Sequence, residues 1–319
     1  MAHQLTMLDG YADMAYVGET PWHGLGNAMP SDADINKWQI ASGTNFEVCR
    51  TPVKFQNGTL HTWKENEVLY RSDNNLPLGL VSSRYKIVQP PKLLEFFRNL
   101  VEQDGFTIET AGSLNGGKRI WALARTGFDA EVVDGDMVKS YILIETSYDR
   151  KSATTARKTS IRVVCQNTLH LAFSSDNCDT VVTIPHSTDF DAASVQISLG
   201  LNHGAVFEAF MLKMRGFANT SLSGQHANEI IEALFARQNA KGDIREKSAF
   251  KNIMAMFNGD GKGANMDGVA GTGWGLVNAV TEFVDFKKRA RSNENRLNSA
   301  WFGSGNKMKQ DIVELLDSF

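Results

Sequence analysis

Few cysteines and no long apolar run mark this chain of 319 residues. Its three cysteines, Cys49, Cys165 and Cys178, have no paired spacing, which argues against a disulfide framework and favours reduced thiols. No stretch approaches the roughly 18 uninterrupted apolar residues of a membrane span. The first residues also lack the basic flank and apolar core of a signal peptide. We therefore expect a cytoplasmic protein without a membrane partner.

Motifs for metal binding and catalysis are missing as well. The histidines are scattered, and the sequence has no C-x-x-C, H-E-x-x-H, Walker-type loop or G-x-S-x-G. No pair of carboxylates stands out as an acid and a base. We predict no metal, no cofactor and no catalytic residue, and hence no enzyme. An alternative is a nucleotide-processing enzyme with an unrecognised site, which would need a pocket that gathers Asp149, His170 and Cys165.

The composition is that of an ordinary globular chain, with 42% hydrophobic and 22% charged residues. Its length suffices for two domains. The formal net charge of -3 argues against a protein coated in basic charge, such as a packager of duplex DNA. It still allows a basic groove on an otherwise acidic body.

The order of predicted elements indicates an α+β fold, with an antiparallel sheet and packed helices first and an all-helical part after it. The Gln56-Asn57-Gly58 and Asn115-Gly116-Gly117 turns each predict a hairpin, and Pro90-Pro91 begins a helix. We expect three parts, an N-terminal arm at 1–45, an α+β core at 46–188 and a helical part at 189–319. Strands are expected at 46–55, 59–63, 68–71, 78–81, 106–113, 118–125 and 138–147, and helices at 31–40, 190–217, 223–237, 246–257, 274–291 and 307–316.

The stretch 141–173 is the most informative. A strand that begins at Tyr141 is followed by a segment rich in Ser, Thr and Ala, then by a second β-branched run, Ile161–Val164, and by Cys165–Phe173, which is expected to start a helix. Five positive charges and no carboxylate lie between Arg150 and Ala172. Such a hairpin can meet phosphates, although a charged edge hairpin protected from aggregation would have the same composition. The candidate nucleic-acid-binding residues are Tyr148, Arg150, Lys151, Arg157, Lys158 and Arg162.

Other basic and aromatic residues are weaker candidates. The cluster Lys287-Lys288-Arg289-Ala290-Arg291 stands at a predicted helix end, where positive charge also complements the helix dipole. Exposed aromatics beside a basic groove can stack bases, whereas aromatics on strands more often form cross-strand core pairs. The aromatic candidates are Trp22, Trp63, Trp121, Tyr141 and Tyr148.

Three separated patches carry a resemblance to a known family. They are TPWHGLG at Thr20–Gly26, SYDRKSAT…RVVCQNTL at Ser147–Leu169, and TGWGLVNAVTEFVDF…WFGSGNKMK at Thr272–Lys309. Together they resemble the phage/plasmid-related protein family, long carried as a domain of unknown function. The usual central motif of that family has glycine and a small residue after its aspartate, whereas Arg150 and Lys151 follow Asp149 here. The turn is therefore expected to be more basic and less tight.

The predicted order of elements is also similar to the core of single-strand annealing proteins of the Red-beta type. That likeness implies a mobile-element protein that binds single-stranded DNA, promotes strand annealing in recombination without catalysis, and forms a homo-oligomeric ring or filament. The five basic candidates would then contact the backbone, and Tyr148 would stack on a base. A replication or host protein partner is possible in this picture. The alternative is a protein-interaction module that acts on a host replication or defence factor.

Overall fold

The structure is a computed structural model, and it describes residues 7–8, 11–18, 26–96, 105–164, 167–170, 181–191, 193–195, 199 and 203–318. The chain forms two compact units. Unit 1 comprises residues 1–127, 141–158 and 181–201, and unit 2 comprises residues 128–140, 159–180 and 202–319. Because the segments interleave, three strands of one sheet each contribute residues to both units.

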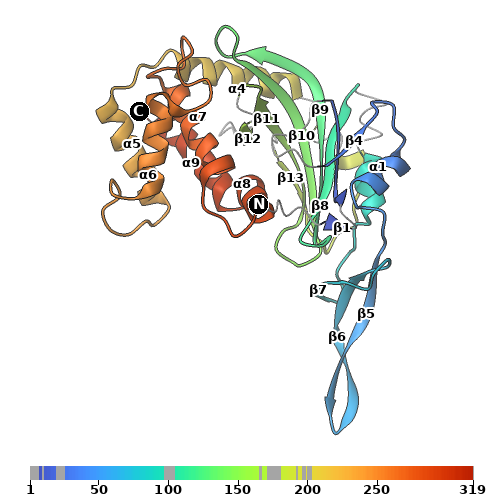
Figure 1. The fold of residues 1–319 in the computed structure, drawn as a ribbon. Coiled ribbons are helices and arrows are strands. Elements are labelled where there is room, and N and C mark those ends of the chain that lie inside the picture. The colour runs from blue at the N-terminus through green and yellow to red at the C-terminus, as the bar shows by residue number, and fades with distance from the viewer. Residues whose placement is uncertain are drawn as a thin grey trace. The chain divides into compact units, whose positions relative to one another are not determined.

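This sheet has eight strands in the order β12-β11-β10-β9-β8-β3-β4, with β13 also pairing with β11 (Figure 1). The pairs β3–β8, β8–β9, β11–β12 and β11–β13 are antiparallel, and β3–β4 is parallel. The strands are β3 (Met14–Val17), β4 (Asn27–Met29), β8 (Thr107–Leu114), β9 (Arg119–Glu131), β10 (Met137–Ser147), β11 (Thr154–Arg162), β12 (Asn167–His170) and β13 (Val181–Ile184). A separate pair is formed by β1 (Met7–Leu8) and β2 (Tyr11–Ala12).

The core of unit 1 forms on one face of its strands. Alternate residues of β9 and β10, among them Ala122, Ala124, Ile142 and Ile144, enter one apolar cluster because successive side chains of a strand point to opposite faces. Residues 90–96 are helical and add the fully buried Leu93, Leu94 and Phe96. The short helix α1 (Ile35–Ala41) is capped by Asp34, whose side chain accepts a hydrogen bond from the Lys37 backbone N–H.

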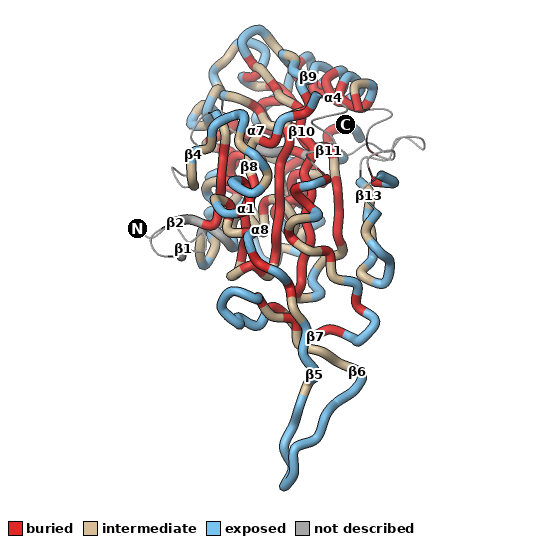
Figure 2. Tube along the Cα trace, turned by 90° about the vertical axis from the view of Figure 1, so that its right-hand side faces the viewer, coloured by how far each residue is buried: buried red, intermediate tan, exposed pale blue. Residues whose placement is uncertain are grey.

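A second sheet of unit 1 consists of β5 (Val48–Asn57), β6 (Thr59–Arg71) and β7 (Pro77–Ser82), in that order. Strand β7 pairs with β6 only between Asn66 and Tyr70, whereas the β5–β6 ladder continues to the Asn57–Thr59 turn. The outer part of the hairpin is therefore two-stranded. Residues 54–65 are all exposed, as Figure 2 shows. We call residues 53–64 the arm.

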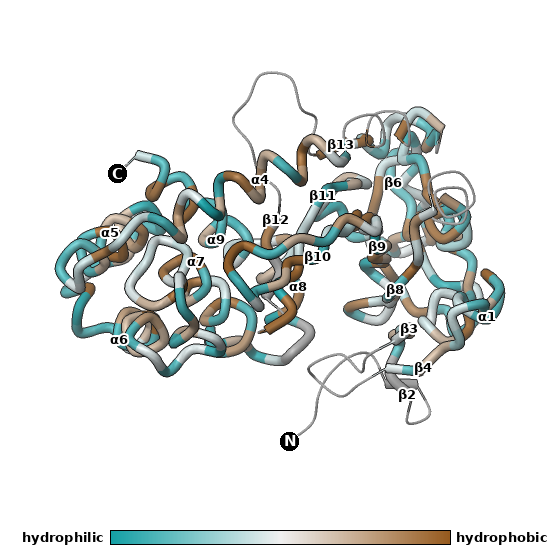
Figure 3. Tube along the Cα trace, turned by 90° about the horizontal axis from the view of Figure 1, so that it is seen from above, coloured by the Kyte–Doolittle hydropathy of each residue, from teal (hydrophilic) through white to brown (hydrophobic). Residues whose placement is uncertain are grey.

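Unit 2 contains most of the helices. They are α4 (His203–Ala218), α5 (Gly224–Arg237), α6 (Ser248–Ala255), α7 (Gly273–Glu282), α8 (Asn293–Phe302) and α9 (Ser304–Asp317), with the π-helical segments η1 (Met256–Asp260) and η2 (Phe283–Lys287). Brown and teal alternate along α4 in Figure 3, and its apolar Val206, Phe210 and Met214 are buried. In the described part of the chain, every helix is too short or too polar to cross a membrane.

Helix α7 is the centre of unit 2, because all ten of its residues are buried. Leu276, Val277 and Val280 pack into the apolar cluster of this unit. Polar side chains in such a helix need partners, since an unpaired buried polar group is costly. Asn278 accordingly donates to the Trp274 carbonyl at 2.8 Å, and Thr281 donates to the Asn278 carbonyl at 3.0 Å.

The predicted α+β class is confirmed, with helices concentrated in the C-terminal part. Both predicted hairpins are present, and the expected helices over 31–40, 223–237, 246–257, 274–291 and 307–316 are found with small shifts. Within the expected helix over 190–217, residues 193–195, 199 and 203–217 are helical, and other positions lie outside the described residues. The three-part division of the chain stays a prediction.

Three predictions need correction. Residues 167–170, expected to lie in a helix that begins at Cys165, form strand β12, which pairs with β11. The second strand of the basic region begins at Thr154, well before the expected start at Ile161. Helix α8 was not predicted, because Asn and Ser dilute its apolar pattern, although Ser292 caps it by accepting from the Asn295 N–H.

Candidate nucleic-acid interface

The turn between β10 and β11 presents two of the predicted binding residues. Arg150 and Lys151 are exposed, and Arg150 adopts a φ of 65°. The Lys151 Nζ lies 3.0 Å from Asp149 Oδ2, but 72% of the lysine side chain is exposed. An exposed pair of this kind contributes only about 0–1 kcal/mol, so it gives way easily to another anion. Both cations are accessible to a phosphate.

Packing within unit 1 fixes this turn. A Cβ added to Gly79 of β7 would lie 2.2 Å from the Tyr148 carbonyl oxygen. Only glycine at this position therefore allows β7 to pack so close to the turn. His186 lies with its ring nitrogens 3.2 Å from the carbonyl oxygens of Lys86 and Ser152, and its ring stacks on Tyr85. Burial lowers the pKa of His186. These contacts hold the basic turn in place.

Tyr148 is fully buried. Its hydroxyl donates to the Val88 carbonyl oxygen at 2.8 Å, and burial raises the pKa of the phenol well above its usual range. The side chain packs in the core of unit 1, with Ile142 and Ile144 among its members. In this structure Tyr148 secures the end of the sheet and presents no face to a base.

Arg157 faces a buried carboxylate. Its guanidinium lies 3.2 Å from Glu145, which also pairs with Arg119 and accepts a 3.0 Å hydrogen bond from the Thr155 hydroxyl. Glu145 is only 2% exposed, and the Arg157 side chain is 14% exposed. The two arginines thus neutralise a carboxylate that the sheet has removed from water. Only a small part of the Arg157 side chain is therefore accessible to a ligand.

Lys158 and Arg162 are buried, at 1% and 2% exposure. Arg162, which belongs to unit 2, donates from Nε to the fully buried Asp136 at 2.6 Å and from Nη1 to the Lys262 carbonyl at 3.1 Å. The Trp274 indole N–H donates to the other Asp136 oxygen at 2.8 Å. This network ties β11 to α7 and to the loop before it.

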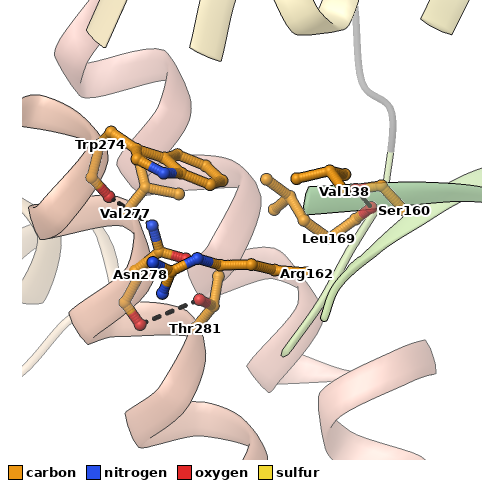
Figure 4. A pocket seen from close by; sticks show the side chains of 8 residues that line it. All are labelled: Val138, Ser160, Arg162, Leu169, Trp274, Val277, Asn278 and Thr281. Atoms are coloured by element: carbon orange, nitrogen blue, oxygen red, sulfur yellow. Dashed lines mark hydrogen bonds between the residues drawn. The ribbon is translucent and has the colours of Figure 1, made fainter. Parts of the chain in front are cut away.

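A small cavity adjoins the same network (Figure 4). It is lined by Val138, Ser160, Arg162, Leu169, Trp274, Val277, Asn278 and Thr281, and its volume is about 10 Å³. That is close to the space of one water molecule, and far below that of a nucleobase. The cavity therefore offers no room for the chemistry of a nucleotide-processing enzyme.

The six predicted residues are thus not one surface. The structure brings Arg150 and Lys151 together on an exposed turn, while Tyr148 and Lys158 are buried in unit 1 and Arg157 is largely covered there. Arg162 belongs to unit 2. The residues that remain open to a ligand are the two in the turn.

The arm carries exposed side chains that the prediction mostly overlooked. Cross-strand pairing places Val53 opposite Trp63 and Phe55 opposite His61 on one face. The Phe55 and His61 rings stack at 5.2 Å, and Phe55 and Trp63 are 53% and 46% exposed. The opposite face carries Lys54 and Leu60, and the exposed Lys64 follows Trp63 where the register of β5 and β6 shifts.

The charge of the arm is positive. Residues 53–64 include two lysines and one histidine but no Asp or Glu. A two-stranded ribbon with exposed aromatic rings gains little from burial and is marginal on its own in water. Exposed aromatic rings and lysines are both features by which proteins bind single-stranded nucleic acids, and here Lys54 lies on the face opposite to Phe55 and His61.

A metal site and the alternative catalytic trio would each need several side chains that lie close together. Among the described residues, no group of three or more His, Cys, Asp or Glu side chains is placed to hold a metal ion. Of the alternative catalytic trio, Asp149 pairs with Lys151, whereas Cys165 and the His170 side chain lie outside the described residues. Most of the TPWHGLG patch, with Trp22, also lies outside them.

A signal for the arm was available in the sequence. The Asn57-Gly58 turn fixes the register, and that register alone aligns Phe55 with His61 and Val53 with Trp63. Of the aromatic candidates, Trp63 is exposed on the arm, whereas Trp121 and Tyr141 are buried, at 0% and 2% exposure. The sequence could not show where β7 ends its pairing. In the described structure β7 pairs only with residues 66–70 of β6, so no third strand accompanies the part of the hairpin that carries these rings.

Comparisons with known proteins connect the chain to a family without an assigned activity. A family described as domain of unknown function (DUF932) matches residues 77–301, well over half of the chain. The match starts at the first residue of β7, so the arm precedes it. No curated protein and no solved structure matches the chain.

Proposed function

The chain belongs to the family described as domain of unknown function (DUF932). From the side chains exposed in unit 1, we propose that it is a noncatalytic protein that binds single-stranded nucleic acid through the arm and the basic turn. The observation that carries the proposal is the exposed arm, which has Phe55, His61 and Trp63 on one face, Lys54 on the other, and Lys64 next to Trp63 in the chain. A single strand offers phosphates to the lysines and accessible bases to the aromatic rings.

Single strands fit this surface better than a duplex. In a single strand the bases are unstacked and accessible, and base stacking on an aromatic side chain contributes about 1–3 kcal/mol per base. In a duplex the bases are already stacked, so exposed Phe55 and Trp63 would gain little from a smooth helix. The arm itself contains no carboxylate, although the exposed Glu65 directly follows Lys64.

The basic turn extends the surface toward the base of the three-stranded sheet. Arg150 and Lys151 follow Tyr148 and Asp149, whose backbone is in close contact with Gly79 of β7. Strand β7 pairs with β6, so the turn contacts the three-stranded sheet that carries the arm. A strand bound along the arm would therefore find further phosphate contacts at the turn.

The biological role we propose is strand annealing or recombination in a phage or plasmid. Such a protein holds the backbone, leaves bases free to pair, and gains avidity when several copies line one strand. It needs no cofactor. Self-assembly into a ring or filament in the cytoplasm of the host belongs to this proposal and predicts particles larger than a dimer in light scattering.

A second candidate is a protein-interaction module. The observation that favours it is the set of exposed apolar side chains on the three-stranded sheet, since Phe55, Leu60, Trp63 and Leu80 are 53%, 65%, 46% and 43% exposed. Apolar docking does not weaken with salt, whereas phosphate binding does. Salt dependence therefore separates the two candidates.

The decisive experiment is fluorescence anisotropy of a labelled single-stranded oligonucleotide at low and moderate salt. Phe55→Ala/Trp63→Ala should weaken binding at least about tenfold, and Lys54→Ala/Lys64→Ala should lower the salt slope by about 1.4, because each lost phosphate contact contributes about 0.7. Exposed Leu212→Ala and Lys92→Ala serve as matched controls and should leave binding unchanged. Binding that is absent, or equal in all these variants, would refute the proposal.

A further inference from the structure

A second basic surface lies in unit 2, at the end of η2 and the start of α8. Lys287, Arg289 and Arg291 are exposed there, and Lys288 is half-buried between them. No Asp or Glu occurs between residues 286 and 293. Lys307, in the first turns of α9, is exposed as well.

Contacts hold this segment in place. Lys288 Nζ donates to the Ser304 hydroxyl at the start of α9 at 3.1 Å, and the Arg296 Nε of α8 donates to the Lys288 carbonyl at 3.3 Å. Burial, and then the charge of Lys309, lower the pKa of Lys288. Because Lys307 lies one helical turn beyond Ser304, on the same side of α9, its charge joins this surface.

Several other basic residues of unit 2 form ion pairs. Lys213 pairs with Asp317, Arg237 with Glu314, Arg245 with Glu232, and Lys251 with Glu246. By contrast, Lys287, Arg289, Arg291 and Lys307 have no ion-pair partner within the described residues. This surface therefore gathers four cations without ion-pair partners among the described residues, which makes it a concentrated patch of positive charge.

Helix dipoles explain only part of the cluster. Lys287 ends η2, where a cation is favourable. Arg291 directly precedes Ser292, the N-cap of α8, and Lys307 lies near the start of α9. A cation near a helix N-terminus is unfavourable by a few tenths of a kcal/mol to about 1 kcal/mol. Bound anions would offset that cost, whereas an empty surface leaves it in place.

We propose that Lys287, Arg289, Arg291 and Lys307 bind the phosphate backbone of a second nucleic-acid segment. The inference rests on the proposed function for the class of its ligand, but it depends on different residues. A chain with one polyanion surface on each unit can hold two strands at once, which raises their effective local concentration for pairing. The surface carries no exposed aromatic cluster, so its binding should follow charge and not base identity.

The test uses the full chain and two noncomplementary oligonucleotides that carry a donor and an acceptor fluorophore. Protein saturated with the first strand should capture the second, seen as energy transfer. Lys287→Gln/Arg289→Gln/Arg291→Gln should weaken second-strand capture at least about tenfold and lower its salt slope by about 2, since three phosphate contacts are lost. First-strand affinity should be unchanged. The matched control Lys241→Gln/Arg245→Gln/Lys251→Gln removes the same charge elsewhere in unit 2 and should capture normally.

The outcomes separate the two proposals. If the chain binds one strand through the arm and the Lys287 triple variant behaves as wild type, this inference is overturned and the proposed function stands. If the arm variants bind normally while the triple variant loses all binding, the surface in unit 2 is the primary site, and both the arm proposal and the two-strand inference are overturned. If the triple variant loses binding to vesicles of phosphatidylserine in phosphatidylcholine but captures oligonucleotides normally, the surface is a membrane site and the inference is overturned.

Discussion

Two stretches of this chain carry dense positive charge in opposite environments. Residues 150–162 contain five Lys or Arg, and residues 287–291 contain four. Lys158 and Arg162 of the first stretch are buried, while Lys287, Arg289 and Arg291 of the second are exposed. The cause is the secondary structure. Strand β11 has partners on both sides, whereas the second stretch leaves η2 and enters α8 on the surface of unit 2.

The difference teaches that charge density in a sequence does not measure accessible charge. A strand inside a sheet carries its side chains to two faces, so a cation there needs a carboxylate and is useful to the fold. Asp136 supplies it for Arg162, and Glu145 supplies it for Arg157. A cation in an exposed connection needs no partner and is available to a ligand. The two stretches should respond to mutation in opposite ways.

The largest effect is expected from breaking the buried pair. Arg162→Met should lower the free energy of unfolding by about 3–5 kcal/mol, because it leaves Asp136 charged and buried with only the Trp274 N–H as a strong donor. Urea unfolding of the purified variant measures it. The double variant Asp136→Leu/Arg162→Met should recover part of the loss. A single-variant loss below about 1 kcal/mol would show that Arg162 is not a structural cation.

The contact that seats the basic turn should come next. Gly79→Ala places a Cβ 2.2 Å from the Tyr148 carbonyl oxygen, a backbone atom that cannot turn aside, and should cost about 1–3 kcal/mol of stability. Gly216→Ala in α4 is the matched control, since nothing lies within 4 Å of its added Cβ. That change should stabilise the protein by about 0.5–1 kcal/mol. Thermal unfolding of both variants that gives the same sign would contradict the packing argument.

A smaller effect follows from pH. Burial lowers the pKa of His186 in the folded protein, so the unfolded chain takes up the proton first as the pH falls below about 6.5. The contribution of this residue to stability is complete above that pH and is lost below it, by at most about 1.4 kcal/mol per pH unit. His186→Asn should therefore lose less stability than wild type between about pH 7.5 and about pH 5.5. Equal losses in urea unfolding at both pH values would argue against a neutral His186.

The smallest effect on stability should belong to the exposed stretch. Lys287→Gln/Arg289→Gln/Arg291→Gln should change the free energy of unfolding by less than about 0.5 kcal/mol per residue, since these side chains have no ion-pair partner in the described structure. A gain is possible where Arg291 precedes the N-terminus of α8. A large loss in the same urea assay would mean that this surface is structural, and it would erase the contrast with β11.

The parts of the fold set by local chemistry were predictable. The Asn-Gly turns located the hairpins, Asp34 located the start of α1, and apolar periodicity located α5 and α9. Long-range partners could not be predicted from local patterns. Asp136 lies 26 residues from Arg162 and 138 residues from Trp274, although the three side chains form one network. The burial of Lys158 and Arg162 could not be predicted for the same reason, since it depends on strands and helices that periodicity cannot pair. Arg150 and Lys151 were placed correctly as exposed because a turn is a local feature.

The interleaving of the two units also constrains how the chain can be made. Strand β9 emerges from synthesis with its last residues already assigned to unit 2, yet most of the helices of that unit follow some 70 residues or more later in the order of translation. Unit 1 likewise waits for residues 181–201 before it is complete. Unit 1 is therefore complete once residue 201 has been synthesised, whereas unit 2 still needs residues 202–319. Residues 128–140 and 159–180 of unit 2 have to wait for the helices that follow them, so unit 1 can form first, as N-terminal domains of many proteins do.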